Sequence, residues 1–163
     1  MDKDFIKAQG YRALDNRLKR ISDRMAHDTR KFFKHIDLDV EPSWHLVFKL
    51  LLEYNKLTMV EIADQLGYTH PSMVSMLKKM ANKGYIVSEQ DESDKRKQNI
   101  KLSQKSKDLL PQLKHIWDSC EAAIYKMLEE DLTILKCLDN IEIALKTVPI
   151  NDRFQSEYQK IKS

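Results

Sequence analysis

The stretch that decides the fold runs from Lys56 to Ser103 and reads KLTMVEIADQLGYTHPSMVSMLKKMANKGYIVSEQDESDKRKQNIKLS. Its first half carries two short helical patterns, separated by a turn that contains Gly67. Its second half carries two alternating patterns, Tyr85–Gln90 and Gln98–Ser103, joined by a highly charged segment. The stretch therefore predicts two helices followed by a hairpin of two strands.

Sequence signals mark both ends of the first helix. Thr58 and Glu61 form a T-x-x-E capping box, in which each side chain accepts a hydrogen bond from the other residue's backbone, so we expect the helix to begin at Met59. Its apolar residues repeat with the spacing of a single helix face: Met59, Ile62, Ala63 and Leu66. Gly67 is expected to end the helix in a left-handed conformation.

The second helix is expected to follow Thr69 as its cap, with Pro71 in the first turn, where a missing backbone N–H has no cost. Gly84 is expected to end it. The buried stripe comprises Met73, Leu77 and Met80. At about 100° per residue, the opposite face projects Pro71, Ser72, Ser75, Lys78, Lys79 and Asn82. With no acidic and no large apolar residue, that face suits the phosphate-lined groove of a nucleic acid.

The hairpin has the pattern of a wing. Ile100 and Leu102 alternate with polar residues, so one face of their strand is expected to be buried. The connecting segment 91–97 reads DESDKRK, cannot form a core, and is expected to be a solvated loop. Leu57 is expected to add a short third strand. Together with the two helices, this hairpin predicts a winged helix-turn-helix, a module that reads DNA.

These residues resemble the MarR family of bacterial transcription regulators. The similarity runs through the capped helix, the second helix from Met73 to Gly84 and the wing pattern D-x-x-D-x-R, and continues through I-x-L-S into a long helix. In that family the wing-tip arginine enters the minor groove and a wing aspartate fixes its geometry, roles that the resemblance assigns to Arg96 and Asp94. The helix after the wing often has a glycine in its first turn, where this chain has Ser106. The resemblance covers roughly residues 10–148.

The predicted DNA-binding surface combines the second helix and the wing. On the helix we expect Ser75 and Lys79 above all to face DNA, whereas His70 either reaches a base edge or phosphate or simply starts the helix. On the wing, Arg96 is expected in the minor groove, since a narrow groove has an enhanced negative potential, and the lysines beside it at phosphates. The full predicted set is His70, Pro71, Ser72, Ser75, Lys78, Lys79, Lys95, Arg96 and Lys97.

Composition agrees with a helical protein of ordinary size. The 163 residues are 42% apolar and 33% charged, and only three Gly and four Pro indicate long helices with few turns. A net charge of +3 is too small for a protein that coats nucleic acid, so the DNA argument depends on where the charges lie. The start, MDKDFIKAQG, lacks the apolar core of a secretory signal, and no apolar run reaches the ~18 residues of a membrane helix. We expect a cytoplasmic protein that does not bind membranes.

Long helices are predicted before the winged-helix part, which spans about 42–103. One helix over 4–36 carries a narrow apolar seam, which is typical of a helix that packs against a partner helix. The seam residues are Tyr11, Leu14, Leu18, Ile21, Met25 and Phe32. After a connector, Pro42 is expected to open an inner helix on which the DNA-reading pair sits. The apolar face of that helix comprises Trp44, Val47, Phe48, Leu51 and Leu52.

Long helices are also predicted after the wing. Ser103 is expected to cap a helix that runs to about Glu130, kinked or shifted in its start by Pro111. A helix over 132–147 and a further short helix after Pro149 follow. The terminal helices, about 4–36 and 104–163, are expected to pair in a two-fold dimer, because each large side chain left exposed costs on the order of 1.5–3 kcal/mol. Such a dimer would present two recognition helices roughly 34 Å apart to a pseudo-palindromic operator.

Other chemistry finds little support in the sequence. Cys120 and Cys137 do not have metal or redox spacing, and Cys120 on an apolar stripe is expected to act as a small hydrophobe rather than an oxidant sensor. The five histidines form no i, i+4 pair, so a metal site would require assembly in space. Neither a Gly-rich phosphate loop nor a nucleophile elbow is present. We therefore expect no enzyme activity, no cofactor and no metal.

The family resemblance implies an effector pocket, because MarR-like regulators often bind small aromatic or lipophilic molecules where their first, second and fifth helices meet. The residues expected near that junction are Trp44, His45, Phe48, His115 and Trp117. The alternative, that these residues are ordinary core, stays open.

The sequence thus predicts one mainly α-helical, MarR-like domain over residues 1–163, with a two-stranded β wing and long N- and C-terminal dimerisation helices. The predicted function is a homodimeric, sequence-specific regulator of transcription, a repressor whose affinity for double-stranded DNA is tuned by a small molecule. The alternative is a winged-helix module that binds protein and has no specific DNA site. Acidic residues around the wing keep that alternative open: Glu89, Asp91, Glu92 and Asp94.

Overall fold

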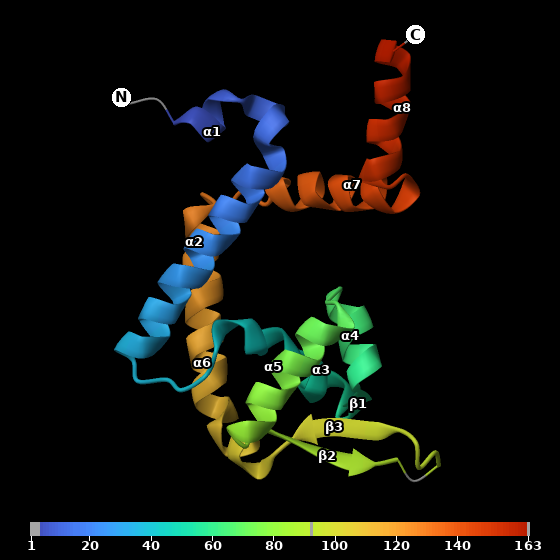
Figure 1. Ribbon diagram of the computed structural model, residues 1–163. Helices are drawn as coiled ribbons and strands as arrows, with labels where there is room; N and C mark the ends of the chain where they lie inside the picture. Colours follow the sequence, from blue (N-terminus) through green and yellow to red (C-terminus); the bar gives the residue numbers. More distant parts are fainter. Residues whose placement is uncertain (1–3, 92, 163) are drawn as a thin grey trace. The chain divides into compact units, whose positions relative to one another are not determined.

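Helices and one small sheet make up the computed structural model, which describes residues 4–91 and 93–162 (Figure 1). The chain divides into two compact units, Met1–Leu109 and Leu110–Ser163. In the first unit the elements are α1 (Phe5–Ala8), η1 (Gly10–Ala13), α2 (Leu14–His35), η2 (Pro42–Trp44), α3 (His45–Tyr54), β1 (Leu57–Thr58), α4 (Met59–Leu66), α5 (His70–Asn82), β2 (Ile86–Gln90) and β3 (Gln98–Leu102). Helix α6 (Gln104–Met127) begins there and continues into the second unit, which also holds α7 (Thr133–Thr147) and α8 (Ile150–Lys162). The predicted mainly α fold with a winged helix-turn-helix is confirmed.

The helix-turn-helix forms where the local sequence requires it. The capping box of α4 is complete, with a hydrogen bond of 2.7 Å from the Thr58 N–H to Glu61 Oε2 and one of 3.3 Å from the Glu61 N–H to Thr58 Oγ1. Gly67 follows the helix with φ +66°, a left-handed conformation that glycine adopts without strain. These local signals fix the entry and exit of α4 and confirm the prediction for this helix.

Helix α5 begins as predicted, but its cap differs. Thr69 occupies the cap position, yet its side chain accepts no bond from the helix backbone and its hydroxyl donates instead to Ser72 Oγ at 2.9 Å. A capping side chain accepts from the second or third helical N–H, and the second position here is Pro71, which has none. The predicted side-chain cap by Thr69 is therefore wrong, although the helix start is right.

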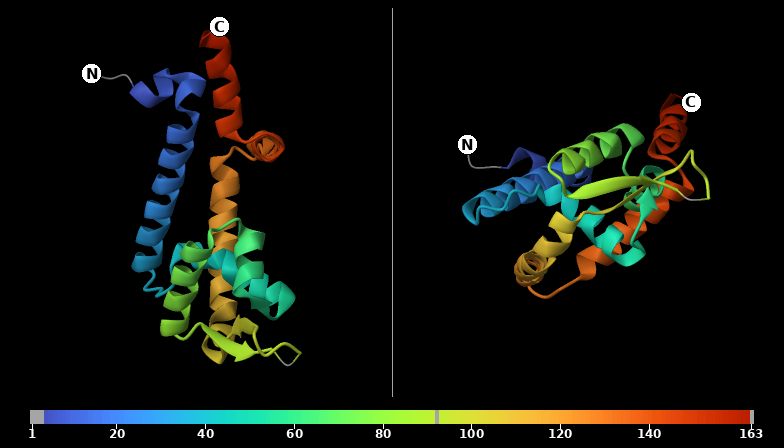
Figure 2. Two further views of the ribbon diagram at one scale, coloured as in Figure 1. Left: turned by 45° about the vertical axis from the view of Figure 1, so that its right-hand side comes forward. Right: turned by 90° about the horizontal axis from the view of Figure 1, so that it is seen from below.

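The sheet has three antiparallel strands in the order β1-β3-β2, so the short strand expected at Leu57 is confirmed. Strand β3 is central: Asn99 lies opposite Thr58 of β1 on one side and opposite Glu89 of β2 on the other. Both views in Figure 2 show the β2–β3 hairpin extending away from the helices of the first unit. The wing loop is therefore carried by a strand that is paired along both edges.

An aromatic cluster holds α5 and the hairpin against α3. The ring of Tyr85, which directly precedes β2, packs edge-on against Trp44 and Phe48 at centroid distances of 5.7 and 5.9 Å. The Tyr85 hydroxyl donates to the backbone oxygen of Asp39 at 2.8 Å. Burying side chains of this size contributes about 1.5–3 kcal/mol each. The stripe of α5 is buried as predicted: Met73, Leu77 and Met80.

The predicted continuous helix over 4–36 is wrong in its first part. Gly10 has φ +59°, which no α-helix accepts, and the chain forms the separate elements α1 and η1 before α2 begins. A glycine inside a helix costs about 1 kcal/mol relative to alanine, so Gly10 is the position at which an interruption of the helix is least costly. Arg20 on α2 ties α1 back through two hydrogen bonds of 2.9 Å to the Asp4 carboxylate, and the same contact lowers the pKa of Asp4 to about 2.

Helix α6 starts as predicted, with Ser103 Oγ accepting the Ser106 N–H at 3.2 Å. Pro111 lies inside the helix and does not displace its start. Ser106 is fully buried and its hydroxyl donates to the backbone oxygen of Tyr85, so the serine that replaces the family glycine joins α6 to the turn before β2. The remaining helices match their predicted positions, and α8 is longer than the short helix expected.

Apolar side chains stay exposed along the terminal helices. Leu18 and Ile21 on α2 retain 39% and 47% of their surface, and the rest of the predicted seam is exposed or half-buried. On α7 and α8 the exposed apolar side chains are Ile134, Leu135, Ile143, Leu145, Ile150, Phe154, Tyr158 and Ile161. One copy of the chain thus leaves these stripes uncovered. Among the described residues, no helix is both long and apolar enough to cross a membrane.

Candidate nucleic-acid interface

The outer face of α5 is available for contact because the opposite face is buried in the core. All the predicted contact residues of this helix are exposed: His70, Pro71, Ser72, Ser75, Lys78 and Lys79. The helix has no Asp or Glu between His70 and Asn82, so its exposed charges are all positive. The face therefore offers hydroxyl and ammonium donors, with no carboxylate of its own to oppose a phosphate.

Val74 is a member of this face that the sequence reasoning missed. Its side chain is 49% exposed, and at about 100° per residue it lies about 60° around the helix from Pro71. The expectation that the face has no large apolar residue is therefore wrong. A branched apolar side chain in a major groove can contact the methyl group of thymine. The angular position was the signal that should have shown Val74 as exposed.

A surface cavity of about 520 Å³ lies along the same side of α5. It is lined by Glu41, Ser43, Trp44, Pro71, Ser72, Ser75, Met76 and Lys79. Glu41 and Ser43 come from the connector and the turn η2, far from α5 in sequence, so no local pattern placed them there. The carboxylate of Glu41 makes this edge of the surface less positive than α5 alone.

At the wing, Arg96 is 91% exposed in its side chain but has a defined orientation. Asp94 Oδ1 accepts the Arg96 backbone N–H and Nε, each at 3.1 Å, and Asp94 Oδ2 accepts Nη2 at 3.3 Å. The hydrogen bond from Arg96 lowers the pKa of Asp94, which keeps this carboxylate charged. An ion pair this exposed adds little to stability, so its effect is on where the guanidinium points.

The other described acids of the hairpin are also engaged by its own donors. Asp91 Oδ1 accepts the N–H groups of Ser93 and Asp94 at 2.9 and 3.0 Å, and Oδ2 accepts Asn99 Nδ2 at 2.6 Å. Glu89 forms an ion pair with Lys101 on the neighbouring strand. Glu92 lies outside the described residues. Glu89 and Asp94 thus have cationic partners and Asp91 has neutral donors, whereas the lysines beside Arg96 are exposed.

The possible metal ligands and the two cysteines were also located in the structure. Within residues 4–91 and 93–162, no group of three or more His, Cys, Asp or Glu side chains is placed to hold a metal ion. Cys120 is half-buried, and burial raises the pKa of its thiol, which lowers the thiolate fraction that oxidants attack. Cys137 is exposed and free.

The residues predicted for an effector pocket belong to both units. Trp44 and Phe48 are buried in the core of the first unit, and His45 is half-buried. His115 and Trp117 lie on the part of α6 that belongs to the second unit. The predicted pocket at their junction stays a prediction.

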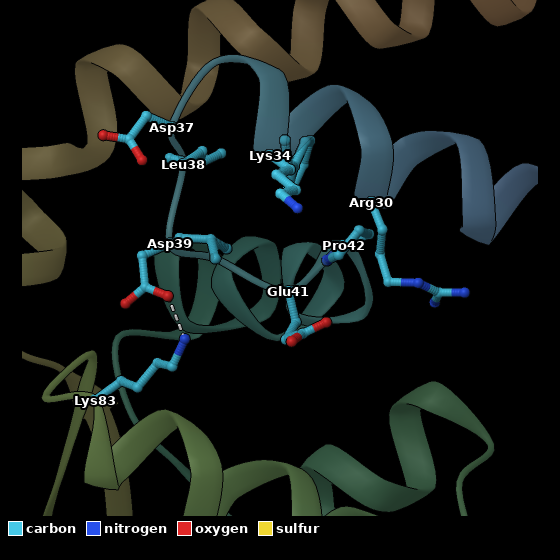
Figure 3. Close-up of a pocket in the computed structure, with 10 residues that line it drawn as sticks. Arg30, Lys34, Asp37, Leu38, Asp39, Glu41, Pro42 and Lys83 are labelled. Carbon is cyan, nitrogen blue, oxygen red and sulfur yellow. Dashed lines mark hydrogen bonds and ion pairs between the residues drawn. The ribbon is translucent and has the colours of Figure 1, made fainter.

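A cavity of about 290 Å³ within the first unit lies at the end of α2 (Figure 3). Phe33 and Val40 among its lining residues are buried, whereas charged side chains surround its opening. Figure 3 shows Lys34 and Glu41 directed toward its middle, with the ion pair of Asp39 and Lys83 at one edge. Lys83 directly follows α5, so this cavity adjoins the end of that helix.

Comparison with known proteins identifies the fold. Residues 38–97 match the model of the MarR family. Reduced AbfR bound to DNA is similar with a TM-score of 0.68 and 21% identity over 88% of this chain and 99% of that one. The S. aureus MepR–DNA complex gives 0.70 and 23% over 81% and 97%, and the transcriptional repressor CouR bound to a 23-mer DNA duplex gives 0.69 and 24% over 87% and 99%. No curated protein matches the sequence.

At identities below 25%, the solved structures establish a shared fold. The family model adds a match in the sequence itself, over the range that holds the end of the connector, α3, α4, α5, β2 and the wing loop. These two findings confirm the resemblance seen in the sequence: residues 38–97 match the MarR family, and the chain shares the fold of the DNA-bound structures.

Proposed function

We propose that this protein is a non-enzymatic, cytoplasmic regulator of transcription that binds double-stranded DNA in a sequence-specific manner as a homodimer. Helix α5 enters the major groove and Arg96 the adjacent minor groove. The observation that supports this most directly is the pairing of an acid-free, exposed helix face with an exposed arginine whose orientation is fixed by Asp94. We further propose that DNA binding represses transcription. Two of the similar structures are a DNA complex of MepR and a repressor, CouR, on DNA.

The rival role, a winged-helix module for protein binding, rests on the acids of the wing. Glu89, Asp91 and Asp94 are engaged by Lys101, by Ser93 with Asn99, and by Arg96 in turn. Carboxylates that are already ion-paired or hydrogen-bonded within the hairpin offer few free acceptors to a basic protein partner. The exposed lysines of α5 and the wing are cationic and favour phosphate.

The test is competition binding of the purified full chain to promoter fragments, including the region upstream of its own gene, against random DNA over a salt series. We expect one pseudo-palindromic site to be bound at least about 10³-fold more tightly than random DNA. Both affinities should fall as salt rises, because binding releases counterions from phosphates. Equal affinity for all fragments, or none, would contradict the proposed function.

We also propose that a small aromatic or lipophilic effector tunes this affinity. The cavity beside Lys83 supports the idea, because a ligand there would contact the residue that ends α5, and a ligand shifts an equilibrium only through unequal contacts with its two states. Lys83 Nζ lies 5.7 Å from the Trp44 ring centroid, so Trp44 fluorescence should report binding.

In a Trp117→Phe variant, Trp44 is the one remaining tryptophan of the sequence. Benzoate and phenylacetate at millimolar concentration are expected to change its emission and to weaken operator binding in the unchanged protein. If the acids bind without any change in DNA affinity, the proposed regulatory role is wrong. If neither the Trp44 emission nor the operator affinity changes, the proposed effector pocket is wrong.

A further inference from the structure

We infer that Asp91 is a positioning residue for DNA binding: it holds the wing loop in the shape in which Asp94 presents Arg96. This inference rests on the proposed DNA-binding function. The family resemblance assigns the positioning role to Asp94 alone. The structure shows a second carboxylate further back, whose hydrogen-bond donors Ser93, Asp94 and Asn99 are not part of the predicted DNA-binding set.

The contacts of Asp91 span the loop. Its Oδ1 gathers the backbone N–H groups of Ser93 and Asp94 and the Ser93 hydroxyl, which fixes the first turn of the loop. The same residue closes the loop at its far end, where its N–H donates to the Lys97 oxygen at 3.0 Å. Asp94 lies between these two points, and its own oxygen accepts the Lys97 N–H at 2.8 Å. The backbone that carries the Asp94 side chain is therefore set by Asp91.

Asn99 anchors the arrangement to the sheet. Its side chain is only 6% exposed and donates from Nδ2 to Asp91 Oδ2 at 2.6 Å. Its backbone belongs to the central strand, paired on both sides. A continuous set of hydrogen bonds thus leads from a buried strand through Asp91 and the Asp94 amide to the guanidinium of Arg96. A loop ordered before binding does not have to be ordered by the DNA, which is how preorganisation increases affinity.

Whether removal of the Asp91 side chain weakens or tightens DNA binding distinguishes a positioning role from simple charge repulsion. A carboxylate close to phosphates weakens binding by repulsion, so removing the Asp91 charge alone should tighten binding to every DNA. Removing a residue that orders the wing should weaken it. The donors from Ser93 and Asn99 hold the pKa of Asp91 well below its ordinary range, so the carboxylate is charged throughout the pH range in which DNA binding is measured.

The experiment is a double-mutant cycle in the full chain, with the promoter fragment of the specificity test as the probe. Asp91→Ala is expected to lower affinity about tenfold. In an Arg96→Ala background, the same substitution should change affinity less than about twofold, because the group that it positions is absent. Hydrogen exchange at the amides of Ser93, Asp94 and Lys97 should accelerate. Glu89→Ala, which removes the same charge from the same hairpin but leaves the loop contacts, is the matched control and should not weaken binding.

Several outcomes would overturn the inference. The inference is overturned if Asp91→Ala binds as tightly as the unchanged chain or more tightly, or if the substitution lowers affinity by the same factor with and without Arg96. Should Asp91→Ala fail to fold, the cycle is repeated with Asp91→Asn, which keeps the acceptor for the two amides but opposes a donor to Asn99, and the same criteria apply. Absence of any operator preference in the unchanged chain counts against the proposed function, whereas a normal operator complex with an indifferent Asp91 counts against this inference alone.

Discussion

Replacing Leu18 and Ile21 together by glutamate is expected to yield a folded monomer that binds operator DNA at least a hundredfold more weakly than the unchanged protein. Both side chains are exposed on one seam of α2, where we propose that a second copy packs. Two buried carboxylates would oppose that packing strongly. A dimer on a two-fold site gains about 10²–10⁴ over a single half, which a monomer loses.

Sedimentation at micromolar concentration measures the first part: the unchanged chain should have twice the 19.2 kDa chain mass, and the variant one. The matched control is Asn16→Glu with His27→Glu, which adds two charges to exposed positions about 150–180° around α2 from the seam. The control should remain a dimer with ordinary affinity. A double seam variant that stays dimeric, or an unchanged chain that sediments as a folded monomer, would contradict the proposed architecture.

Replacing Arg96 by alanine should have the second largest effect, on both affinity and selectivity. We expect at least tenfold weaker operator binding and a smaller preference for A·T-rich flanks, because a narrow minor groove attracts an inserted arginine. Lys97→Ala should instead weaken binding to operator and random DNA alike. Its log–log salt slope should fall by about 1.8, since each phosphate contact contributes about 0.9 and the dimer has two wings.

The helix variants Ser75→Ala and Lys79→Ala complete that comparison and should change preference among operator variants, since base edges differ in the major groove. Ser75 is expected to give the smaller change. Competition binding against operator and random DNA over a salt series measures all four variants. Equal losses on both DNAs for the two helix variants would leave α5 as an anchor on the backbone. An unchanged salt slope for Lys97→Ala would contradict the proposed contact between Lys97 and a phosphate.

Local chemistry explains which structural features the sequence predicted. The capping box of α4 and the hairpin order depend on residues that are neighbours in the chain, so short-range rules locate them. Gly10 shows the limit of periodicity: the seam of apolar residues continues through it, but the backbone does not. Ser106 shows the limit of resemblance, because a buried hydroxyl with a partner has a role that the family glycine cannot have.

The candidate site divides along the same line. Exposed residues of α5 and the wing followed from helical angles and from the family pattern. The contacts of Asp91 with Asn99 did not, because they depend on which strand pairs with which and on the shape of a loop. Glu41 and Ser43 beside α5 were equally invisible, since the connector reaches that face only through the tertiary packing. The role of a side chain that acts through another side chain can be recognised only from the folded structure.

Thr58 is shared between two parts of the first unit: it pairs with Asn99 in the sheet, and its side chain and backbone close the first turn of α4. The wing and the helix-turn-helix therefore share a residue, and a tilt of one relative to the other would strain the contacts of Thr58. In the proposed dimer, an effector would therefore move each winged helix-turn-helix as a unit. We expect such an effector to act on the distance between the two recognition helices, and so on how well that distance matches the period of the double helix.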